Sequence, residues 1–253
     1  MFYRILDQAS ITCNDQVIEV MPPTSRSRQG ETRRADGERT RDQLMDAAEA
    51  LFAAHGVDGV SVRSINAAAG LAPASVHYHF GDKDGLLRQV ITRRGEAVVA
   101  RQAELLAVLA GRRRRPTPEE SVRVLAEPLF ELVRSEPVGG ARWLTVVAGL
   151  VAADDERVYR VGFGPGSVQE RINRAVADAF PHEDPAVVAD RWRLASTALL
   201  QLMAGSAAEL AGDDEQAARG RFEVIVGFVA AGLAGVCRSR PVGAAQPARA
   251  RRG

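Results

Sequence analysis

The sequence predicts an all-α protein, and three observations support that prediction. The chain of 253 residues contains 42 alanines, and alanine favours helices more strongly than any other residue. Aromatic residues, which favour strands, make up only 5% of the chain. Apolar residues recur at helical spacing through most of the sequence, with glycines or prolines at the breaks. An all-β sandwich or barrel is therefore not expected.

Composition narrows the class of protein further. Hydrophobic residues make up 46% of the chain and charged residues 26%, which are ordinary globular values and argue against wholesale disorder. The formal net charge is only +1, so any surface that binds nucleic acid must be a local patch. The two cysteines, Cys13 and Cys237, are too few for a disulfide framework or a four-ligand zinc site. We expect a reduced, cytoplasmic protein without a metal or another cofactor.

Neither membrane insertion nor secretion is expected. The longest uncharged apolar run, Val224–Cys237, has fourteen residues, whereas a membrane-spanning helix needs about 20. No basic-then-apolar segment with a small-residue cleavage site opens the chain, so no secretory leader is predicted. We interpret the apolar run as a buried helix.

Residues 1–36 have no regular spacing of apolar residues, and this predicts a disordered basic arm. Residues 1–20 read as sequence unrelated to the rest of the chain, so Met21 is an alternative start to Met1. A second interpretation of the arm is direct contact with DNA phosphates. It rests on four arginines that lie close together: Arg26, Arg28, Arg33 and Arg34.

Two helices are predicted between residues 40 and 70. Thr40–Gln43 has the spacing of a capping box, and apolar residues then recur on one helix face until Gly56. Ser61 is a favourable N-cap for a second, short helix, which Gly70 stops.

Two further helices follow a tight turn. Pro73 opens a third short helix that runs to about Phe80. Asp82 caps a fourth, whose leucines and valines recur at helical spacing to Leu109. Short helices joined by a tight, glycine-containing turn form a helix-turn-helix unit.

A helix-turn-helix unit places its second motif helix in a DNA major groove, while the preceding helix braces it. In that helix only Val76 and Phe80 are clearly inward. Lys83 is poorly placed for the dipole of the fourth helix, which suggests that an anion of a partner compensates it. The candidate DNA-binding residues lie outward or near helix ends: Ser61, Arg63, Pro73, Ala74, Ser75, His77, Tyr78, His79 and Lys83.

Residues 40–87 resemble the DNA-binding domain of the TetR/AcrR family of transcriptional repressors. The stretch Gly70–Leu87 follows the family signature through its glycine, Ser75, the aromatic block ending at Phe80, Lys83 and the paired leucines. The match covers about a fifth of the chain at many spaced positions. Upstream groups that also fit the pattern are Ala47-Ala48, Leu51-Phe52, His55-Gly56 and Val60-Ser61-Val62-Arg63.

Three positions depart from the family pattern. His77 stands where the family usually has a phosphate-contacting tyrosine, and Asn66 where an alanine is common. Ala72 stands where a serine or threonine cap is usual, a loss of roughly 1 kcal/mol of capping. These departures leave the fold intact and bear on the phosphate contacts and the operator sequence.

The resemblance implies a division of the chain into four parts. After the arm of residues 1–36, it implies a DNA-binding domain over 37–97 and a helical ligand-binding and dimerisation domain over 98–237. Residues 238–253 contain five arginines and no acidic residue, and predict a disordered tail. The four arginines in Gly111–Pro118 are interpreted as a solvated turn, with a phosphate-binding patch as the alternative.

The C-terminal part is predicted to be helical over 119–135, 141–153, 167–180, 186–211 and 214–237. Residues 224–237 are apolar on every face, which favours burial against a partner subunit; a central helix of a monomer is the alternative. The interface candidates are Leu199, Leu202, Val226, Val229 and Leu233. Five aromatic residues are candidates for lining a ligand pocket: Phe130, Trp143, Tyr159, Phe163 and Trp192. In the alternative interpretation, each of them belongs to the hydrophobic core.

The predicted function is ligand-responsive control of transcription. We expect a homodimer that binds a pseudo-palindromic, double-stranded operator and is released by a small, mostly apolar effector. Three alternatives stay open: a DNA-binding activator, a ligand-independent architectural regulator and a protein-binding helical module. An enzyme or a metal site is not expected, because no metalloprotease or nucleophile-elbow motif occurs, and His77 and His79 do not share a helix face.

Overall fold

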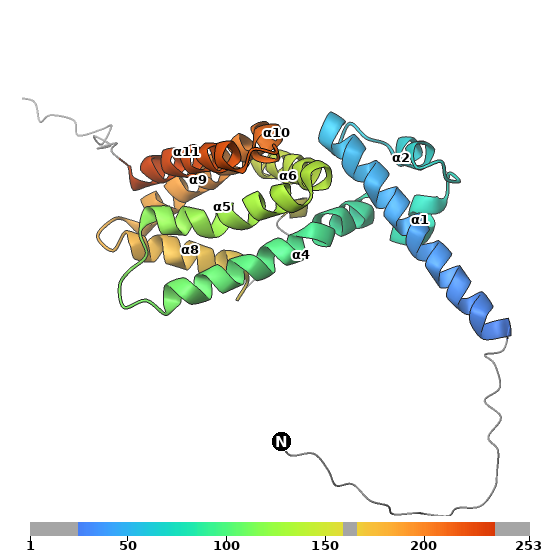
Figure 1. Cartoon of the computed structure of the whole chain (residues 1–253), viewed down its shortest axis with the longest axis horizontal. Helices are drawn as coiled ribbons and strands as arrows, with labels where there is room; N and C mark the ends of the chain where they lie inside the picture. The colour runs from blue at the N-terminus through green and yellow to red at the C-terminus, as the bar shows by residue number, and fades with distance from the viewer. Residues whose placement is uncertain (1–24, 159–165, 236–253) are drawn as a thin grey trace, which may run out of the picture. The chain divides into compact units, whose positions relative to one another are not determined.

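The computed structural model describes residues 25–158 and 166–235. Every regular element in these two ranges is a helix, which confirms the all-α prediction (Figure 1). The chain divides after Thr40 into two units, and the second unit holds both hydrophobic cores. The described helices are α1 (Ser25–His55), α2 (Val62–Ala68), α3 (Ser75–Phe80), α4 (Lys83–Ala110), α5 (Pro118–Ser135), α6 (Pro137–Ala152), α8 (Val168–Ala179), α9 (Pro185–Gly205), α10 (Ala207–Leu210) and α11 (Glu215–Ala234).

Helix α1 begins earlier than the sequence pattern predicts. Thr40 is not an N-cap: its hydroxyl donates to the carbonyl oxygen of Asp36 at 2.8 Å, a bond between successive turns of one helix. The prediction of a disordered arm is therefore wrong for residues 25–36, and residues 1–24 lie outside the described part. The residues just before Thr40 are mostly polar and charged helix formers without proline, so a helix forms there although it has no apolar face.

A first hydrophobic core joins α1, α2, α3 and the first half of α4 with Val146 and Leu150 of α6. The side chains of Leu44, Phe52, Ile65, Val76 and Leu86 are at most 2% exposed. Burying a large apolar side chain stabilises the fold by roughly 1.5–3 kcal/mol, so these contacts hold the short helices against α1, α4 and α6. The predicted helix-turn-helix is present, except that Pro73 and Ala74 lie in the turn and α3 begins at Ser75.

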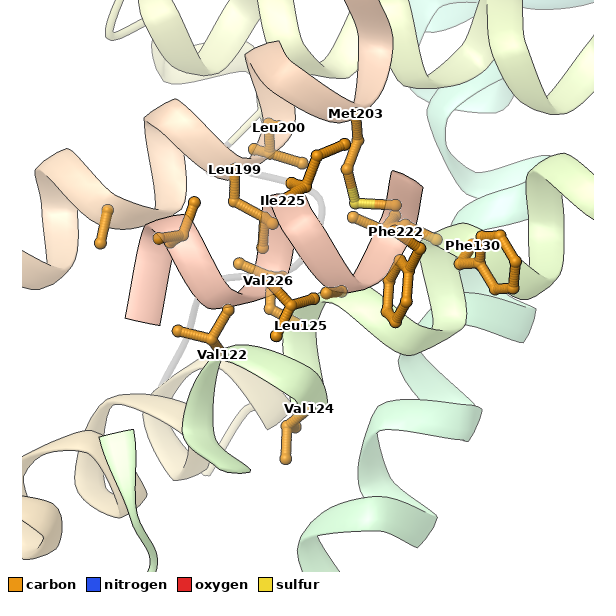
Figure 2. Close-up of a cluster of buried hydrophobic side chains, with 14 of the residues drawn as sticks. Val122, Val124, Leu125, Phe130, Leu199, Leu200, Met203, Phe222, Ile225 and Val226 are labelled. Atoms are coloured by element: carbon orange, nitrogen blue, oxygen red, sulfur yellow. The ribbon is translucent and has the colours of Figure 1, made fainter. Parts of the chain in front are cut away.

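A second core holds the remaining helices together. Figure 2 shows side chains of α5, α9 and α11 meeting in it, among them Val122, Leu199, Met203, Phe222 and Val226. The helices predicted over 119–135, 141–153, 167–180, 186–211 and 214–237 are found as α5, α6, α8, α9 with α10, and α11.

Two boundaries in this bundle differ from the prediction. Pro137 does not break a helix but opens α6, because proline is well suited to the first helical turn. The single helix predicted over 186–211 ends at Gly205, and Ser206 separates it from the one-turn helix α10. Among the described helices, none combines the length and apolar character that a membrane crossing requires.

The turn between α4 and α5 favours the solvated interpretation of its arginines. Arg112 and Arg114 both form ion pairs with Glu120, which also closes a reciprocal capping pair with Thr117. Hydrogen bonds from Arg114 lower the pKa of Glu120 to about 2. Two of the four arginines are thus neutralised within the chain.

Helix α4 belongs to both cores. Leu87 and Val90 in its first half are buried among residues of α1, α2 and α3. Val98 and Leu106 in its second half are buried among residues of the C-terminal helices. A displacement of α4 would therefore affect the helix-turn-helix and the bundle together.

Candidate nucleic-acid interface

Helix α2 begins with a reciprocal cap. The Ser61 hydroxyl accepts a hydrogen bond from the Ser64 backbone N–H at 3.0 Å, and the Ser64 hydroxyl accepts one from the Ser61 backbone N–H at 3.1 Å. This confirms Ser61 as the N-cap. Arg63, two residues on, is exposed and forms no ion pair with any residue that the structure describes. Its guanidinium is therefore available to a phosphate.

Asn66 fixes the turn between α2 and α3. Its side chain is 2% exposed, and its amide nitrogen donates to the carbonyl oxygen of Pro73 at 2.7 Å. Its amide oxygen accepts from the backbone N–H of Val76 at 3.2 Å. The N-cap of α3, Ala74, has no side chain that can cap, so Asn66 supplies that function from the neighbouring helix. This compensates the missing cap at Ala72.

Arg41 holds the other end of α3. Its guanidinium donates to the carbonyl oxygen of His79 at 3.1 Å and to the side-chain oxygen of Gln89 on α4 at 3.2 Å. The guanidinium carbon also lies 4.8 Å from the centroid of the Phe80 ring. One cation thus joins α1, the C-terminal end of α3 and α4.

Lys83 is held within the chain. Its ammonium group donates to the carbonyl oxygens of Val57 and Val60, each at 3.1 Å. The two carbonyl groups after α1 thus stabilise this lysine within the chain, and the expected contact with a partner's anion stays a prediction. An ammonium group has three donors, so one remains for a phosphate.

The predicted contact residues of α3 gather on one exposed patch. Tyr78 is 85% exposed, and His77, Ala74 and Pro73 are exposed as well. Ser75 is half-buried, and Val76 is fully buried beneath the patch. Of the two residues expected to face inward, Val76 is buried and Phe80 is half-buried.

The two histidines of α3 differ in their surroundings. The Nδ1 atom of His77 is 2.7 Å from the carbonyl oxygen of Gly81, so this nitrogen carries the hydrogen and donates. His79 is half-buried, its ring lies 4.9 Å from that of Tyr78, and burial together with the charge of Arg41 lowers its pKa. His79 is consequently uncharged near neutral pH and adds no positive charge to the patch.

Comparison with known proteins agrees with this geometry. A family model described as bacterial regulatory proteins of the tetR family matches residues 44–90, and a tetracyclin repressor-like C-terminal domain matches residues 123–232. The HTH-type transcriptional repressor Rv1474c of Mycobacterium tuberculosis is 30% identical over 146 residues, which span 56% of this chain and 72% of that protein. The chain belongs to the TetR family.

Further relatives agree with that assignment. The HTH-type transcriptional repressor AcnR of Corynebacterium glutamicum is 29% identical over 109 residues, or 42% of this chain and just over half, 56%, of that protein. The crystal structure of the probable transcriptional regulatory protein RHA5900 has the same fold, with a TM-score of 0.52, 16% identity, and coverage of 77% of this chain and 99% of that one. The two curated relatives are HTH-type transcriptional repressors, and this chain belongs to the same family.

The C-terminal part of this TetR-family chain contains two large cavities. The first, about 610 Å³, is here named the α4 cavity because Thr92, Gly95 and Gln102 of α4 form one wall. The second, about 580 Å³, is named the α9 cavity after Trp192 and its neighbours on α9. Both volumes lie in the range of sites for small organic molecules.

The predicted pocket aromatics separate into three groups. Trp143 lines the α4 cavity and Trp192 the α9 cavity. Phe130 lines neither and is core, because its ring stacks on that of Phe222 with centroids 4.6 Å apart. Tyr159 and Phe163 lie outside the described residues.

Most of the predicted interface residues are buried inside the single chain. Leu199, Val226 and Leu233 are 0% exposed and Val229 is 3% exposed. They cannot form an interface surface, because α5, α9 and α11 bury them against one another. Leu202, at 37%, is exposed. The apolar side chains that α9 and α11 do expose are Val187, Leu194, Leu202, Val224 and Phe228.

Sequence reasoning also missed a charge cluster between α1 and α4. The Glu49 side chain is 3% exposed and forms ion pairs with Arg93, at 3.0 Å, and with Arg94. Burial raises the pKa of Glu49, and the two arginines oppose that rise. Arg93 also pairs with the exposed Asp46 at 2.8 Å. The adjacent arginines Arg93 and Arg94 were the available signal, since two cations on the inner part of a helix require a partner.

Proposed function

We propose that this regulator is a dimeric repressor that leaves its operator when a small, mostly apolar molecule enters the α4 cavity. The observation that carries the proposal is the double role of α4. Thr92, Gly95 and Gln102 line the cavity, while Leu87 and Val90, earlier on the same helix, pack in the core of the helix-turn-helix. An occupant of the cavity therefore contacts the helix that supports the DNA-binding unit.

Trp143 supports this coupling. Its indole N–H donates to the carbonyl oxygen of Ile91 at 2.9 Å, and both residues line the α4 cavity. A Cβ atom at Gly95, one turn further along α4, would lie 3.5 Å from the Trp143 ring. A molecule that displaces Trp143 would alter the contact of α6 with α4 at this point.

The dimer is supported by the apolar side chains that α9 and α11 expose. Phe228 is 69% exposed, Val224 64% and Leu194 56%. Neighbouring exposed positions of α11 are small, including Gly227 and Gly232, where an added Cβ would meet nothing within 4 Å. Such a face suits close packing against a second copy of the same surface.

A two-fold dimer would present two α3 helices, so we expect operator half-sites about one helical turn or a small multiple apart. A small change in the separation of the two α3 helices would then prevent simultaneous binding of both half-sites. An effector achieves this only if it binds the released state more tightly than the operator-bound state.

The test is operator binding titrated with a panel of apolar small molecules. A true effector should lower operator affinity by about 5- to 150-fold, the usual range of such coupling. Thermodynamic reciprocity requires that operator lowers the affinity for the effector by the same factor. A molecule that binds the α4 cavity equally well with and without operator would show that the two sites are uncoupled and would rule out this mechanism.

A further inference from the structure

The α4 cavity has an unusual distribution of polar groups. Apolar side chains of α5, α6, α8 and α9 form most of its wall, among them Leu129, Val147 and Leu200. No arginine, lysine or histidine lines it among the residues that the structure describes. Among these described lining residues, the one that carries a charge is Glu96, which is exposed and negative.

Gln102 is the buried polar group of this wall. It is 6% exposed, and its amide forms no hydrogen bond with another residue in the described part of the chain. Four earlier residues of α4 also line the cavity at helical spacing: Thr92, Gly95, Glu96 and Val99. Gln102 therefore lies on the face of α4 that forms the cavity wall. Its amide atoms are not among the fully buried atoms without a partner in the described part of the chain, so they keep some accessible surface, where a bound molecule can hydrogen-bond to them in place of water.

Three of the other polar lining groups are already engaged, whereas the half-buried Thr92 and the exposed Glu96 border the cavity less deeply than Gln102. The indole N–H of Trp143 donates to the Ile91 carbonyl, and the Gln169 amide donates to the Asn173 side chain at 3.0 Å. The Ser167 hydroxyl caps α8. Gln102 therefore differs from these groups in having both a donor and an acceptor available.

We propose, on the basis of the function proposed above, that the effector is uncharged and mainly apolar, and that its single polar group hydrogen-bonds to Gln102. A carboxylate in this cavity would have no cation among the described lining residues and would face the negative charge of Glu96. Burying an unpaired anion is costly, so the site discriminates against acids of the same shape. An amide or a hydroxyl group satisfies Gln102 without that cost.

Binding of matched probes tests the proposal. The chain has two tryptophans, so Trp192→Phe leaves Trp143 as the single fluorophore, at the wall of the α4 cavity. Decanamide should change its fluorescence saturably, and decanoate, which has the same chain length, should bind at least about 10-fold more weakly. Butylbenzene serves as a probe without a hydrogen-bonding group.

Substitution of Gln102 separates the hydrogen bond from the shape of the cavity. In the same background, Gln102→Leu should weaken decanamide binding about 5- to 10-fold, the usual effect of one lost hydrogen bond, and should not weaken butylbenzene binding. The matched control is Gln169→Leu, a glutamine of the same cavity whose amide is already bonded, and it should not change the preference for decanamide over decanoate.

The outcomes distinguish this proposal from the function on which it rests. The role of Gln102 would be overturned if decanoate bound as tightly as decanamide. It would also be overturned if Gln102→Leu left the affinity for decanamide unchanged. Failure of all three probes to bind would overturn both proposals. Selective binding of decanamide without any release of operator DNA would support the chemistry of the cavity and contradict ligand-released repression.

Discussion

The side-chain amide of Asn66 donates a hydrogen bond of 2.7 Å to the carbonyl oxygen of Pro73 and accepts one from the backbone N–H of Val76. A residue of α2 thus replaces the cap that α3 lacks. Because α3 has only six residues, it depends on such external contacts more than on its own hydrogen bonds. Asn66 therefore holds the N-terminal end of α3 in place, as Arg41 holds its C-terminal end.

Asn66→Ala should lower the free energy of unfolding by roughly 2–3 kcal/mol, because it leaves the Val76 N–H and the Pro73 carbonyl without partners. Denaturant unfolding measures this. Ser64→Ala, which removes one half of the exposed cap of α2, is the control and should cost only about 1 kcal/mol. An Asn66→Ala variant as stable as the Ser64→Ala variant would refute the role assigned to Asn66.

Arg63→Ala should weaken binding to all DNA sequences alike and reduce the slope of log affinity against log salt concentration by about one, as expected for a lost phosphate contact. Its stability should be unchanged, since Arg63 is exposed. Lys83→Ala should also weaken binding, but with a lower melting temperature, because Lys83 holds the carbonyls of Val57 and Val60. Unchanged DNA affinity in either variant would remove that residue from the interface.

Glu49→Ala should destabilise the protein by about 3–5 kcal/mol, because it removes the buried counter-ion of Arg93 and Arg94 and leaves them only the exposed partners Asp46 and Glu136. Asp46→Ala is the matched control. Asp46 also pairs with Arg93, but its side chain is 66% exposed, so its loss should cost no more than about 1 kcal/mol. Calorimetric or denaturant unfolding of the two variants distinguishes them, and equal losses would contradict a structural role for Glu49.

Phe228→Glu and Val229→Glu, adjacent substitutions on α11, should have different effects. Phe228 is 69% exposed, so Phe228→Glu should give a folded monomer if this face forms the dimer. Val229 is 3% exposed, so Val229→Glu should unfold the chain by burying an unpaired charge. Sedimentation and circular dichroism measure both results. A Phe228→Glu variant that sediments as the unmodified chain does would place the interface elsewhere.

Local signals in the sequence predicted the fold well. Ser61 and Asp82 mark helix starts through their side-chain oxygens, and Gly70 marks a helix end through its positive φ; the structure confirms all three. The early start of α1 was missed because a polar helix carries no apolar period.

The site was predictable only where exposure follows from helix periodicity. The outward position of Tyr78 could be predicted, whereas the contacts of Arg41, Asn66 and Lys83 join segments distant in sequence and leave no periodic signal. The same limit explains the error at Val226 and Val229. An apolar helix is buried on most of its surface, but the sequence does not tell which neighbour covers each face.

The most direct test of the central claim is a nuclease footprint of the purified, unmodified chain on the DNA upstream of its own coding sequence, compared with Tyr78→Ala. We expect protection of two half-sites related by a dyad and centred about one helical turn or a small multiple apart. We also expect that Tyr78→Ala remains folded but loses or changes the protected sequence. A single asymmetric footprint, or the same footprint for both proteins, would contradict operator recognition by a pair of α3 helices.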